Sequence, residues 1–318
     1  MISVVVVNAN GREIIEECLN SLLNQSLNEN VEIIVVDNGS TDLSSEYISE
    51  KFPEIKLIKF TEKIGFAKAN NEALKVAQGE FIALLNNDAV ADKYWLENLH
   101  KTIQKYPGVA SCTSKILFYN RKNIIDTAGD NFSIFGYGKK RGHNKNKDNY
   151  NKLEEVLSAS GCASIYRKQI LEEVGFFDED FFGYYEDIDL SLRLQLRGYK
   201  CLYVPDAIVY HRLGTTFKIG SDLFIYLVQR NQEYVLIKDI PLALFLIVYP
   251  LHLIFVIWTF IIYTLRGKGR IVFNAKKEAF LNSNKMFEKR IVIQQSRKIS
   301  SFALLKKIMT SVFGNRRL

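Results

Sequence analysis

Short apolar runs alternate with amphipathic segments through the first 90 residues of the chain. The apolar runs have the length and composition of buried strands, and they are Ser3 to Val7, Val31 to Val36, Leu57 to Phe60 and Phe81 to Leu85. Between them, residues 14–23 and Ala67 to Ala77 repeat apolar side chains at the spacing of one helix face. This alternation predicts an α/β fold with a mostly parallel sheet and helices on both faces.

Two of the predicted strands end in polar residues. The fourth runs directly into Asn86-Asn87-Asp88, and the second runs into Asp37-Asn38-Gly39-Ser40. Ligands of open α/β sheets bind beyond the carboxyl ends of the strands, so Asp88 stands where a metal ion or a phosphate would meet it. Asp37 similarly has the chemistry to accept the imide N–H of a uracil or thymine ring. Both segments are also ordinary turn sequences, and a purely structural turn is the competing interpretation.

A second group of acids occurs later in the chain, at Glu186, Asp187 and Asp189. An amphipathic helix follows and ends at Gly198, which places these acids in its first turn. The helix dipole stabilises carboxylates there by ~0.3–1 kcal/mol each, so a structural role is a serious alternative. Four aromatic residues precede the acids, namely Phe181, Phe182, Tyr184 and Tyr185. Such a cluster suits the wall of a sugar-binding site better than an exposed surface, and it favours function.

The composition of the 318 residues limits the class of protein. A hydrophobic content of 47% is enough for a full core and about two domains. The four cysteines are far apart and form no CxxC pair, so we expect reduced thiols and neither a zinc site nor a disulfide framework. The N-terminus lacks the basic region of a signal peptide, and we expect the catalytic part to begin inside the cell. There is no GxGxxG or P-loop motif to support dinucleotide or P-loop binding.

Residues 241–265 contain no Lys, Arg, Asp or Glu and are long enough to cross a ~30 Å hydrocarbon core as one helix. Residues 266–318 carry 14 Lys and Arg against 2 Asp and Glu, a net charge of +12 that leaves −5 for residues 1–265. The positive-inside rule argues against moving such a tail across a membrane. With Pro250 and His252 inside the stretch, we predict a re-entrant or interfacial helical hairpin bent near Pro250. A single span and a buried helix pair of a soluble protein are the alternatives.

The basic tail itself has helical periodicity, with Phe302, Leu305, Met309 and Val312 beside lysines. We expect an amphipathic helix on a membrane surface, with packing on the protein's own body as the alternative. Basic residues after an apolar stretch favour anionic lipids over nucleic acid as the partner. The polar segment from Lys139 to Asn151 is expected to be a mobile loop that covers a cleft.

Four motifs in this order resemble the family-2 inverting glycosyltransferases of GT-A fold, over roughly residues 2–235. They are Val35-Val36-Asp37-Asn38-Gly39-Ser40-Thr41-Asp42, Gly65-Phe66-Ala67-Lys68-Ala69-Asn70-Asn71, Leu84-Leu85-Asn86-Asn87-Asp88, and Tyr185-Glu186-Asp187-Ile188-Asp189-Leu190 with Arg193 and Gly198-Tyr199. The rhamnosyltransferase-like branch is the most similar. The resemblance implies a catalytic domain over residues 1–238. The apolar and charge patterns add a membrane hairpin or single transmembrane segment over residues 239–265 and a basic amphipathic tail over residues 266–318.

The resemblance also implies roles for individual residues. Asp88 would bind Mg²⁺ or Mn²⁺ on the donor diphosphate, and His211, in Tyr210-His211-Arg212-Leu213-Gly214, matches a late histidine that reaches the metal or the diphosphate in some relatives. Asp187 would be the general base, and Glu186 would orient the acceptor or the base. The implied donor-binding residues are Asn8, Asp37, Asn38, Gly65, Lys68, Asn70, Asn71, Asn86 and Asn87. Asn86 replaces the first Asp of the simple DxD form, and Lys68 and Ala69 replace glycines that are frequent in related sequences.

The implied function is transfer of a hexose or deoxyhexose from a nucleotide-diphosphate sugar, with UDP- or dTDP-sugars favoured. The acceptor is expected to be a hydroxyl of a lipid-linked glycan at the cytoplasmic face of the cell membrane, in the synthesis of a cell-surface polysaccharide. The alternative is a non-catalytic subunit that binds or scaffolds a polysaccharide-assembly complex, which the intact acids disfavour. A nucleotidyltransferase is a third possibility, but Asn8-Ala9-Asn10-Gly11-Arg12 is a poor version of the glycine-rich loop that it needs.

Overall fold

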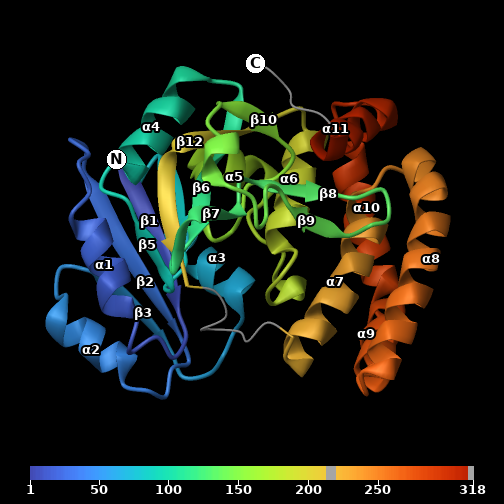
Figure 1. Cartoon of the computed structure of the whole chain (residues 1–318), viewed down its shortest axis with the longest axis horizontal. Helices are drawn as coiled ribbons and strands as arrows, with labels where there is room; N and C mark the ends of the chain where they lie inside the picture. The colour runs from blue at the N-terminus through green and yellow to red at the C-terminus, as the bar shows by residue number, and fades with distance from the viewer. Residues whose placement is uncertain (213–219, 314–318) are drawn as a thin grey trace.

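The computed structural model describes residues 1–212 and 220–313, and Figure 1 shows a sheet with covering helices at one side and a group of long helices at the other. Leu213 and Gly214 of the motif around His211, and residues 314–318 of the tail, lie outside the described residues. The strands of the described main sheet are β1 (Ile2–Asn8), β2 (Val31–Asn38), β3 (Lys56–Phe60), β4 (Phe81–Leu85), β5 (Ala89–Ala91), β6 (Val109–Phe118), β7 (Arg121–Thr127), β10 (Glu154–Val156), β11 (Ala163–Arg167) and β12 (Lys200–His211). A small hairpin consists of β8 (Asp130–Phe132) and β9 (Gly138–Lys140).

Helices flank the sheet and extend beyond it. They are α1 (Ile15–Leu23), α2 (Ser44–Lys51), α3 (Phe66–Val76), α4 (Trp95–Lys105), α5 (Lys168–Val174), α6 (Glu186–Leu196), α7 (Asp222–Asp239), α8 (Leu242–Leu265), α9 (Gly269–Leu281), α10 (Ser283–Gln295) and α11 (Ser301–Phe313), with short 3₁₀ turns η1 (Lys147–Asn149) and η2 (Glu179–Phe181). The predicted first four strands and the helices between them are confirmed, with β4 matching its predicted bounds. The short helix α2 was not among the predicted elements.

The main sheet is parallel in its N-terminal half and mixed in the rest. The order along its main path is β10-β12-β6-β11-β4-β1-β2-β3, in which β4, β1, β2 and β3 are parallel and β11 lies antiparallel between β4 and β6. In the register of β1 with β2, Asn8 pairs with Asp37, so two predicted donor-binding residues meet at the strand ends. The sheet therefore gathers polar strand ends from distant parts of the sequence at one edge.

Alternate residues of each strand face opposite layers, because side chains point to the two sides of a strand in turn. Ile2, Val4 and Val6 belong to the hydrophobic cluster beneath α1 and α4, whereas Val5 and Val7 belong to the cluster beneath α3 and α6. These two clusters confirm the predicted helices on both faces. All four cysteines are buried and unpaired, as expected.

The helix α8 corrects the predicted hairpin at residues 241–265. It runs without interruption from Leu242 to Leu265, with Pro250 inside it. A proline removes one backbone hydrogen bond, and the long helix, which packs on α7 and α9, continues through that loss. The helix is long and apolar enough to cross a membrane, and only 17% of its most apolar window is buried inside the protein.

The last helix also differs from the prediction of a surface helix bound only to a membrane. Leu304 and Ile308 of α11 are buried in a hydrophobic cluster with residues of α6, α7 and α8. Of the predicted apolar face, Phe302 is 75% exposed and the side chain of Val312 lies outside the described residues. Lys307 Nζ bonds Glu155 Oε1 at 2.8 Å. One side of α11 therefore packs on the protein's own body, as the alternative prediction stated.

Candidate active site

A cavity of about 420 Å³ opens where the strand ends meet the first turn of α6. This volume lies within the usual range for small-molecule sites, ~300–1,000 Å³. The acidic and imidazole side chains that line it are Asp88, Asp130, Glu186, Asp187 and His211, and the predicted donor residues that line it are Asn38, Asn86 and Asn87. The cavity therefore joins the two acidic segments that the sequence separates by nearly a hundred residues.

Asn8 connects the strand ends on the donor side of the cavity. Its Nδ2 donates to Asp37 Oδ1 at 3.0 Å, and its Oδ1 accepts a hydrogen bond from Asn87 Nδ2 at 3.1 Å. A Cβ on Gly11 would lie 2.2 Å from Asn8 Oδ1, so only glycine fits beside this junction. Asn38 Oδ1 accepts from the backbone N–H of Ile64 at 2.7 Å. These bonds fix the ends of β1, β2 and β4 relative to one another.

Asp88 and His211 face each other across the next part of the cavity. His211 Nε2 lies 3.1 Å from Asp88 Oδ1, and both side chains are almost fully buried. The other ring nitrogen, Nδ1, lies 2.9 Å from Asp126 Oδ2, so a carboxylate orients the imidazole from behind. A carboxylate oxygen is a ligand for Mg²⁺ or Mn²⁺, and an imidazole nitrogen is a ligand for Mn²⁺ once it has lost its proton. The carboxylate behind the histidine is a common second layer of such sites. The predicted pair Asp88 and His211 is thus brought together, but the described residues contain no group of three or more acidic, His or Cys side chains arranged to hold a metal ion by themselves.

Lys140 completes this charged group from the hairpin of β8 and β9. Its Nζ lies 2.7 Å from Asp126 Oδ1, and its side chain also lines the cavity. Burial alone would raise the pKa of Asp126, but the hydrogen bond with His211 and the charge of Lys140 hold it at about 2. Asp126 is therefore an anion throughout the physiological pH range and keeps His211 oriented.

The first turn of α6 presents Glu186 and Asp187 to the same cavity. Asp187 Oδ2 accepts a hydrogen bond from the Gly161 backbone at 2.9 Å, and Oδ1 accepts from Ile188 N at 2.8 Å. Glu186 Oε2 is buried and finds no hydrogen-bond partner among the described residues. Burial raises the pKa of Asp187 and raises that of Glu186 well above the ordinary value. A carboxylate that is both oriented and raised in pKa is suited to accept a proton.

A strained backbone segment places these two acids. Phe182, Tyr184 and Tyr185 all have positive φ, which is rare for bulky residues. Asn231 of α7 fastens the segment, because its Nδ2 lies within hydrogen-bond distance of the carbonyls of Phe181 at 2.9 Å, Gly183 at 2.9 Å and Tyr184 at 2.7 Å. The start of α6 thus depends on Asn231, which was not among the predicted site residues.

The predicted aromatic wall is only partly correct. Tyr184 and Tyr185 line the cavity, but Phe181 is fully buried in the hydrophobic cluster of α6 and α7. Phe182 packs over Gly65, where an added Cβ would lie 2.6 Å from the Phe182 carbonyl oxygen. The rings of Phe181 and Phe182 therefore serve the packing of the segment.

The motif from Gly65 to Asn71 lies beside the cavity, and its asparagines are committed to internal bonds. Asn70 Nδ2 donates to the Phe66 carbonyl at 2.8 Å, and Asn71 exchanges two hydrogen bonds with the Phe177 backbone at 2.9 and 3.1 Å. Of this motif only Phe66 lines the cavity, and Lys68 and Asp37 do not. Asn71 therefore braces the segment before α6, and donor binding by Gly65, Asn70 and Asn71 stays a prediction.

The predicted loop from Lys139 to Asn151 has more structure than expected. Its first residues belong to β9, and it also contains η1. Gly138, Lys139 and Lys140 line the cavity, so the expectation that this segment covers a cleft is correct for its beginning. Asp126 and Asp130 were not among the predicted site residues, yet Asp126 bonds His211 and Asp130 lines the cavity. The only local signal for them was a pair of acids around Thr127-Ala128-Gly129, at the end of a β-branched run.

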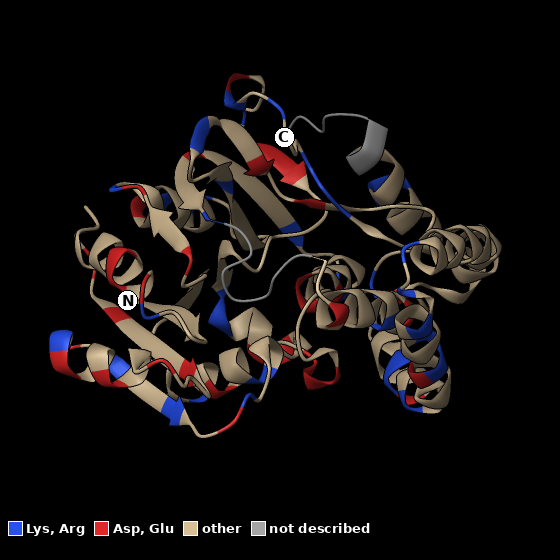
Figure 2. Ribbon diagram, turned by 60° about the horizontal axis from the view of Figure 1, so that its bottom comes forward, with Lys and Arg blue, Asp and Glu red and all other residues tan. Residues whose placement is uncertain are grey.

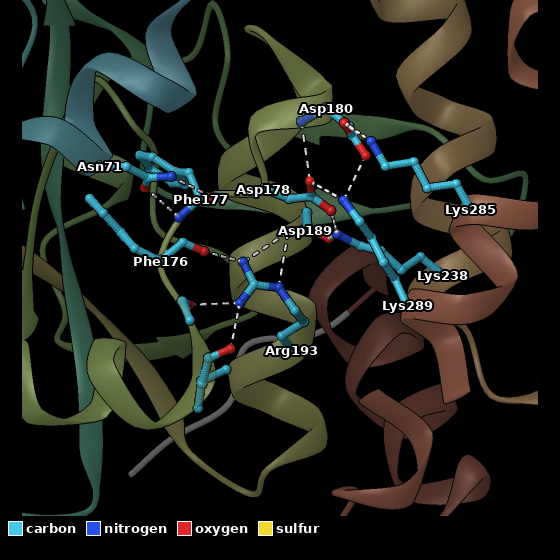
Figure 3. A network of polar contacts seen from close by, with 12 residues as sticks. Asn71, Phe176, Phe177, Asp178, Asp180, Asp189, Arg193, Lys238, Lys285 and Lys289 are labelled. Carbon is cyan, nitrogen blue, oxygen red and sulfur yellow. Dashed lines mark hydrogen bonds and ion pairs between the residues drawn. The ribbon is translucent and has the colours of Figure 1, made fainter. Parts of the chain in front are cut away.

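Buried ion pairs hold α6 against the C-terminal helices, as Figure 3 shows. Lys238 of α7 pairs with Asp189 of α6 and lies 2.6 Å from Asp178 Oδ2. Arg193 Nε donates to Asp189 Oδ2 at 2.9 Å, and Lys289 of α10 lies 2.5 Å from Asp178 Oδ1. The predicted boundaries at 238 and 265 therefore cut through an ionic network and the hydrophobic cluster around α7.

Replacement of Lys238 by methionine is expected to lower the free energy of unfolding by about 3 kcal/mol, because it leaves Asp189 buried with only Arg193 as a counter-charge. The side chains of Lys238 and Asp189 are 1% and 0% exposed. Lys285→Met is the matched control, since Lys285 is 55% exposed in its ion pair with Asp180 and should cost under ~1 kcal/mol. Urea unfolding monitored by circular dichroism measures both. Equal stability of the two variants would contradict the importance of the buried network.

Comparison with known proteins gives matches in sequence and in structure. The model described as "Glycosyl transferase family 2" matches residues 3–175. The O-antigen biosynthesis protein RfbC of Myxococcus xanthus is 26% identical over 226 residues, which are 66% of this chain and 17% of that protein. The poly-beta-1,6-N-acetyl-D-glucosamine synthase of Staphylococcus epidermidis is 27% identical over 213 residues, which are 66% of this chain and 49% of that protein. The chain thus spans half or less of the length of these relatives.

Solved structures share the fold. TarS 1-349 of S. aureus in complex with UDP-GlcNAc has a TM-score of 0.60 at 20% identity, covering 98% of this chain and 89% of that one. The mannosyltransferase PcManGT of Pyrobaculum calidifontis with GDP-Man and Mn²⁺ has a TM-score of 0.55 at 20% identity, covering 97% and 86%. GalNAc-T7 with UDP, GalNAc and Mn²⁺ has a TM-score of 0.58 at 18% identity, covering 74% and 49%. These matches confirm the fold that the motifs implied.

Proposed function

The chain belongs to glycosyl transferase family 2 and has the GT-A fold, and on this premise we propose that it transfers a sugar from a nucleotide-diphosphate donor to an acceptor hydroxyl with inversion. One observation carries the proposal: a single cavity contains both the pair Asp88 and His211 and the oriented carboxylate Asp187. The pair Asp88 and His211 suits binding of the leaving diphosphate through a metal ion. The carboxylate of Asp187 suits removal of the proton from the attacking hydroxyl. The intact acids also argue against a purely scaffolding role.

Asp88 and His211 would hold Mg²⁺ or Mn²⁺. The support is chemical, because a buried carboxylate and a buried imidazole face one another at 3.1 Å and Asp126 keeps the imidazole ring in place. When bound, the ion offsets the negative charge that develops on the leaving nucleoside diphosphate. Two of the structural neighbours were crystallised with Mn²⁺. His211 therefore acts with Asp88, and Asp126 acts by positioning His211.

Asp187 would be the general base. It accepts the proton of the acceptor hydroxyl while that oxygen attacks the anomeric carbon, and the bond to the diphosphate breaks on the opposite side of the sugar. The N–H groups of Gly161 and Ile188 hold its carboxylate in one orientation. Glu186, whose raised pKa favours the protonated form, has an oxygen available to bind a sugar hydroxyl. It would orient the acceptor.

The donor is proposed to carry UDP or dTDP, and the sugar to be a hexose or a deoxyhexose. Asn8, Asp37 and Asn87 form one hydrogen-bonded group at the strand ends, where a nucleoside would lie, and Asn38 and Asn86 line the cavity beside it. The TarS and GalNAc-T7 structures contain UDP or a UDP-sugar, which supports a uridine or thymidine base. Lys68 lies two residues after Phe66, which lines the cavity, and is proposed to contact a phosphate of the donor.

The acceptor is proposed to be a lipid-linked glycan in the synthesis of a cell-surface polysaccharide, at the cytoplasmic face of the membrane. The names of the sequence relatives, an O-antigen biosynthesis protein and a polysaccharide synthase, support this class of product. The exposed apolar helix α8 supports contact with a membrane. The rhamnosyltransferase-like branch is a further prediction about the donor sugar.

A thermal-shift screen of nucleotide sugars with and without Mn²⁺ tests the donor half of this proposal. A ligand that binds only the native state stabilises it by about 2.7 kcal/mol at a hundredfold excess over Kd, which corresponds to a rise in Tm of about 3–6 °C. We expect such a rise with one UDP- or dTDP-sugar in the presence of Mn²⁺, and a smaller one after EDTA. The free sugar is the control. If no nucleotide sugar raises Tm with the metal present, the proposed donor site is wrong.

A further inference from the structure

The helix α8 exposes one long apolar side and buries the other. The side chains that are more than 40% exposed lie on one face of the helix, and they include Leu246, Ile247, Ile254, Ile257, Trp258 and Ile261. The fully or nearly buried side chains lie on the opposite face, and they are Leu244, Val248, His252 and Thr259. Soluble proteins rarely expose so continuous an apolar stripe, so the outward face of α8 is a contact surface.

The buried face of α8 is fixed to the protein by polar groups near the middle of the helix. His252 is fully buried, and its Nε2 lies 2.8 Å from Glu233 Oε1 of α7. Its Nδ1 lies 2.8 Å from the Phe135 carbonyl oxygen, between β8 and β9. Lys276 of α9 lies 2.6 Å from the same Glu233 oxygen. If α8 crossed a bilayer in this structure, Glu233 and Lys276 would be carried to the level of the hydrocarbon core, where charged side chains are strongly disfavoured.

Basic residues follow the apolar helix α8 in the next two helices, α9 and α10. Figure 2 shows no charged residue on α8, whereas α9 and α10 beside it carry several lysines and arginines. Arg270, Phe273, Lys277 and Phe280 alternate cationic and aromatic side chains along one exposed side of α9. Among the described residues, neither Arg270 nor Lys277 forms an ion pair. Basic and aromatic side chains beside an exposed apolar helix are typical of elements that bind the interface of an anionic membrane.

We propose that α8 lies in the plane of an anionic bilayer, with its face of Ile254, Ile257 and Trp258 in the headgroup boundary and its His252 face on the protein. The helix is thus an interfacial element and not a membrane span. This inference rests on the proposed function, in which the acceptor is bound to a membrane. It adds which side of the enzyme faces that membrane.

The hairpin of β8 and β9 connects this surface to the cavity. Tyr137 stacks on Phe255 of α8 with ring centroids 4.8 Å apart, and a Cβ on Gly136 would lie 2.6 Å from His252 Nδ1. The next residues, Gly138 and Lys139, line the cavity, and the Gly138 N–H donates to the Tyr185 hydroxyl at 2.9 Å. A bilayer that contacts α8 therefore lies a few residues away from the cavity wall, as a lipid-linked acceptor requires.

Vesicle binding by the full chain tests the surface. We expect the protein to float with vesicles that contain phosphatidylglycerol and to bind pure phosphatidylcholine less, with added salt weakening the difference. Trp258 fluorescence should shift to the blue on binding, while Trp95, which is fully buried, provides a constant background. The double variant Ile254→Glu/Ile257→Glu should bind at least about tenfold more weakly. Leu23→Glu, at a 42% exposed leucine of α1, is the matched control and should bind normally.

Labelling of engineered cysteines distinguishes an in-plane helix from a span. Leu242→Cys and Arg266→Cys lie at the two ends of α8, and the four native cysteines are buried and contribute little background. In sealed inside-out membrane vesicles, an in-plane helix lets an impermeant maleimide reach both positions. Protection of one position until detergent is added would overturn the proposal in favour of a span.

Two further outcomes would also overturn it. One is normal vesicle binding by the double glutamate variant. The other is a wild-type protein that is a dimer in buffer and does not bind vesicles, together with a double variant that is a monomer. The nucleotide-sugar thermal shift should be unchanged in the double variant. If the double variant loses vesicle binding but keeps the thermal shift, the membrane surface is lost while the proposed donor site is intact. Loss of the thermal shift would instead indicate a failure at the donor site.

Discussion

Replacement of Asp187 by asparagine is expected to lower the rate of sugar transfer by about 10²–10⁴-fold, because a general base contributes a factor of this size. The substitution keeps the size of the side chain and an oxygen that can accept from Gly161 or Ile188. It removes only the ability to take the proton from the acceptor hydroxyl. Donor binding should therefore remain close to that of the wild type.

Steady-state transfer and donor affinity by calorimetry measure the two expectations separately. Glu172→Gln is the matched control, because it makes the same carboxylate-to-amide change at a side chain that is 60% exposed on α5. We expect wild-type rates in that control. Turnover by Asp187→Asn within tenfold of the wild type would remove Asp187 as the base.

The pH dependence of transfer follows from the same assignment. A base acts in its ionised form, so activity should rise with pH through the pKa of Asp187, which burial raises above its ordinary value. The acid limb of the profile should consequently lie above the range of an exposed aspartate, about 3.9. Asp130 also lines the cavity, and burial together with the charge of Asp187 raises its pKa to about 7. Glu186 shares the cavity and also has a raised pKa, so an acid limb that persists both in Asp130→Asn and in Glu186→Gln identifies Asp187 as the titrating group.

The sequence was sufficient to predict the elements whose signals are local. The run Phe81–Leu85 is apolar throughout because β4 lies between two strands and is buried on both faces, and its bounds were predicted correctly. The placement of Glu186 and Asp187 in the first turn of a helix was likewise correct. The amphipathic pattern runs back from Gly198, which follows the helix end with a positive φ, to these two acids. The strand-end rule then brought Asp37, Asn87 and Asp88 to one edge of the sheet.

Features that depend on distant contacts were not predictable in the same way. Asp126 orients His211 across 85 positions of sequence, and nothing local distinguishes it from other acids. Lys238 looks like an ordinary surface lysine in α7, yet it is buried between Asp178 and Asp189. The straight course of α8 through Pro250 depends on its packing with α7 and α9. Charge and hydropathy patterns describe a segment, but they do not describe the partner against which it packs.

Replacement of Asp88 by alanine is expected to remove the part of donor binding that depends on the metal and to lower kcat/KM by about 10²–10⁴-fold, since a metal supplies several kcal/mol of charge stabilisation. Asp88 is the residue on which the proposed metal site chiefly depends, because Asn86 has replaced the first acid of the motif. His211 keeps its contact with Asp126 in this variant, so the ring should stay in place. His211→Ala should show the same loss of metal dependence to a smaller extent.

Donor titrations with Mn²⁺ and with EDTA measure this effect as the ratio of the two Kd values. The wild type should show a large ratio and Asp88→Ala a ratio near one, with Tm in the absence of ligand reporting whether the fold is intact. Asp206→Ala, at an exposed position of β12, makes the same change away from the cavity and should keep the wild-type ratio. A ratio unchanged in Asp88→Ala would refute the assignment. In that case Asp88 would serve the turn after β4, where its carbonyl accepts a hydrogen bond from Arg212 N at 2.9 Å, and the divalent ion would have to bind elsewhere.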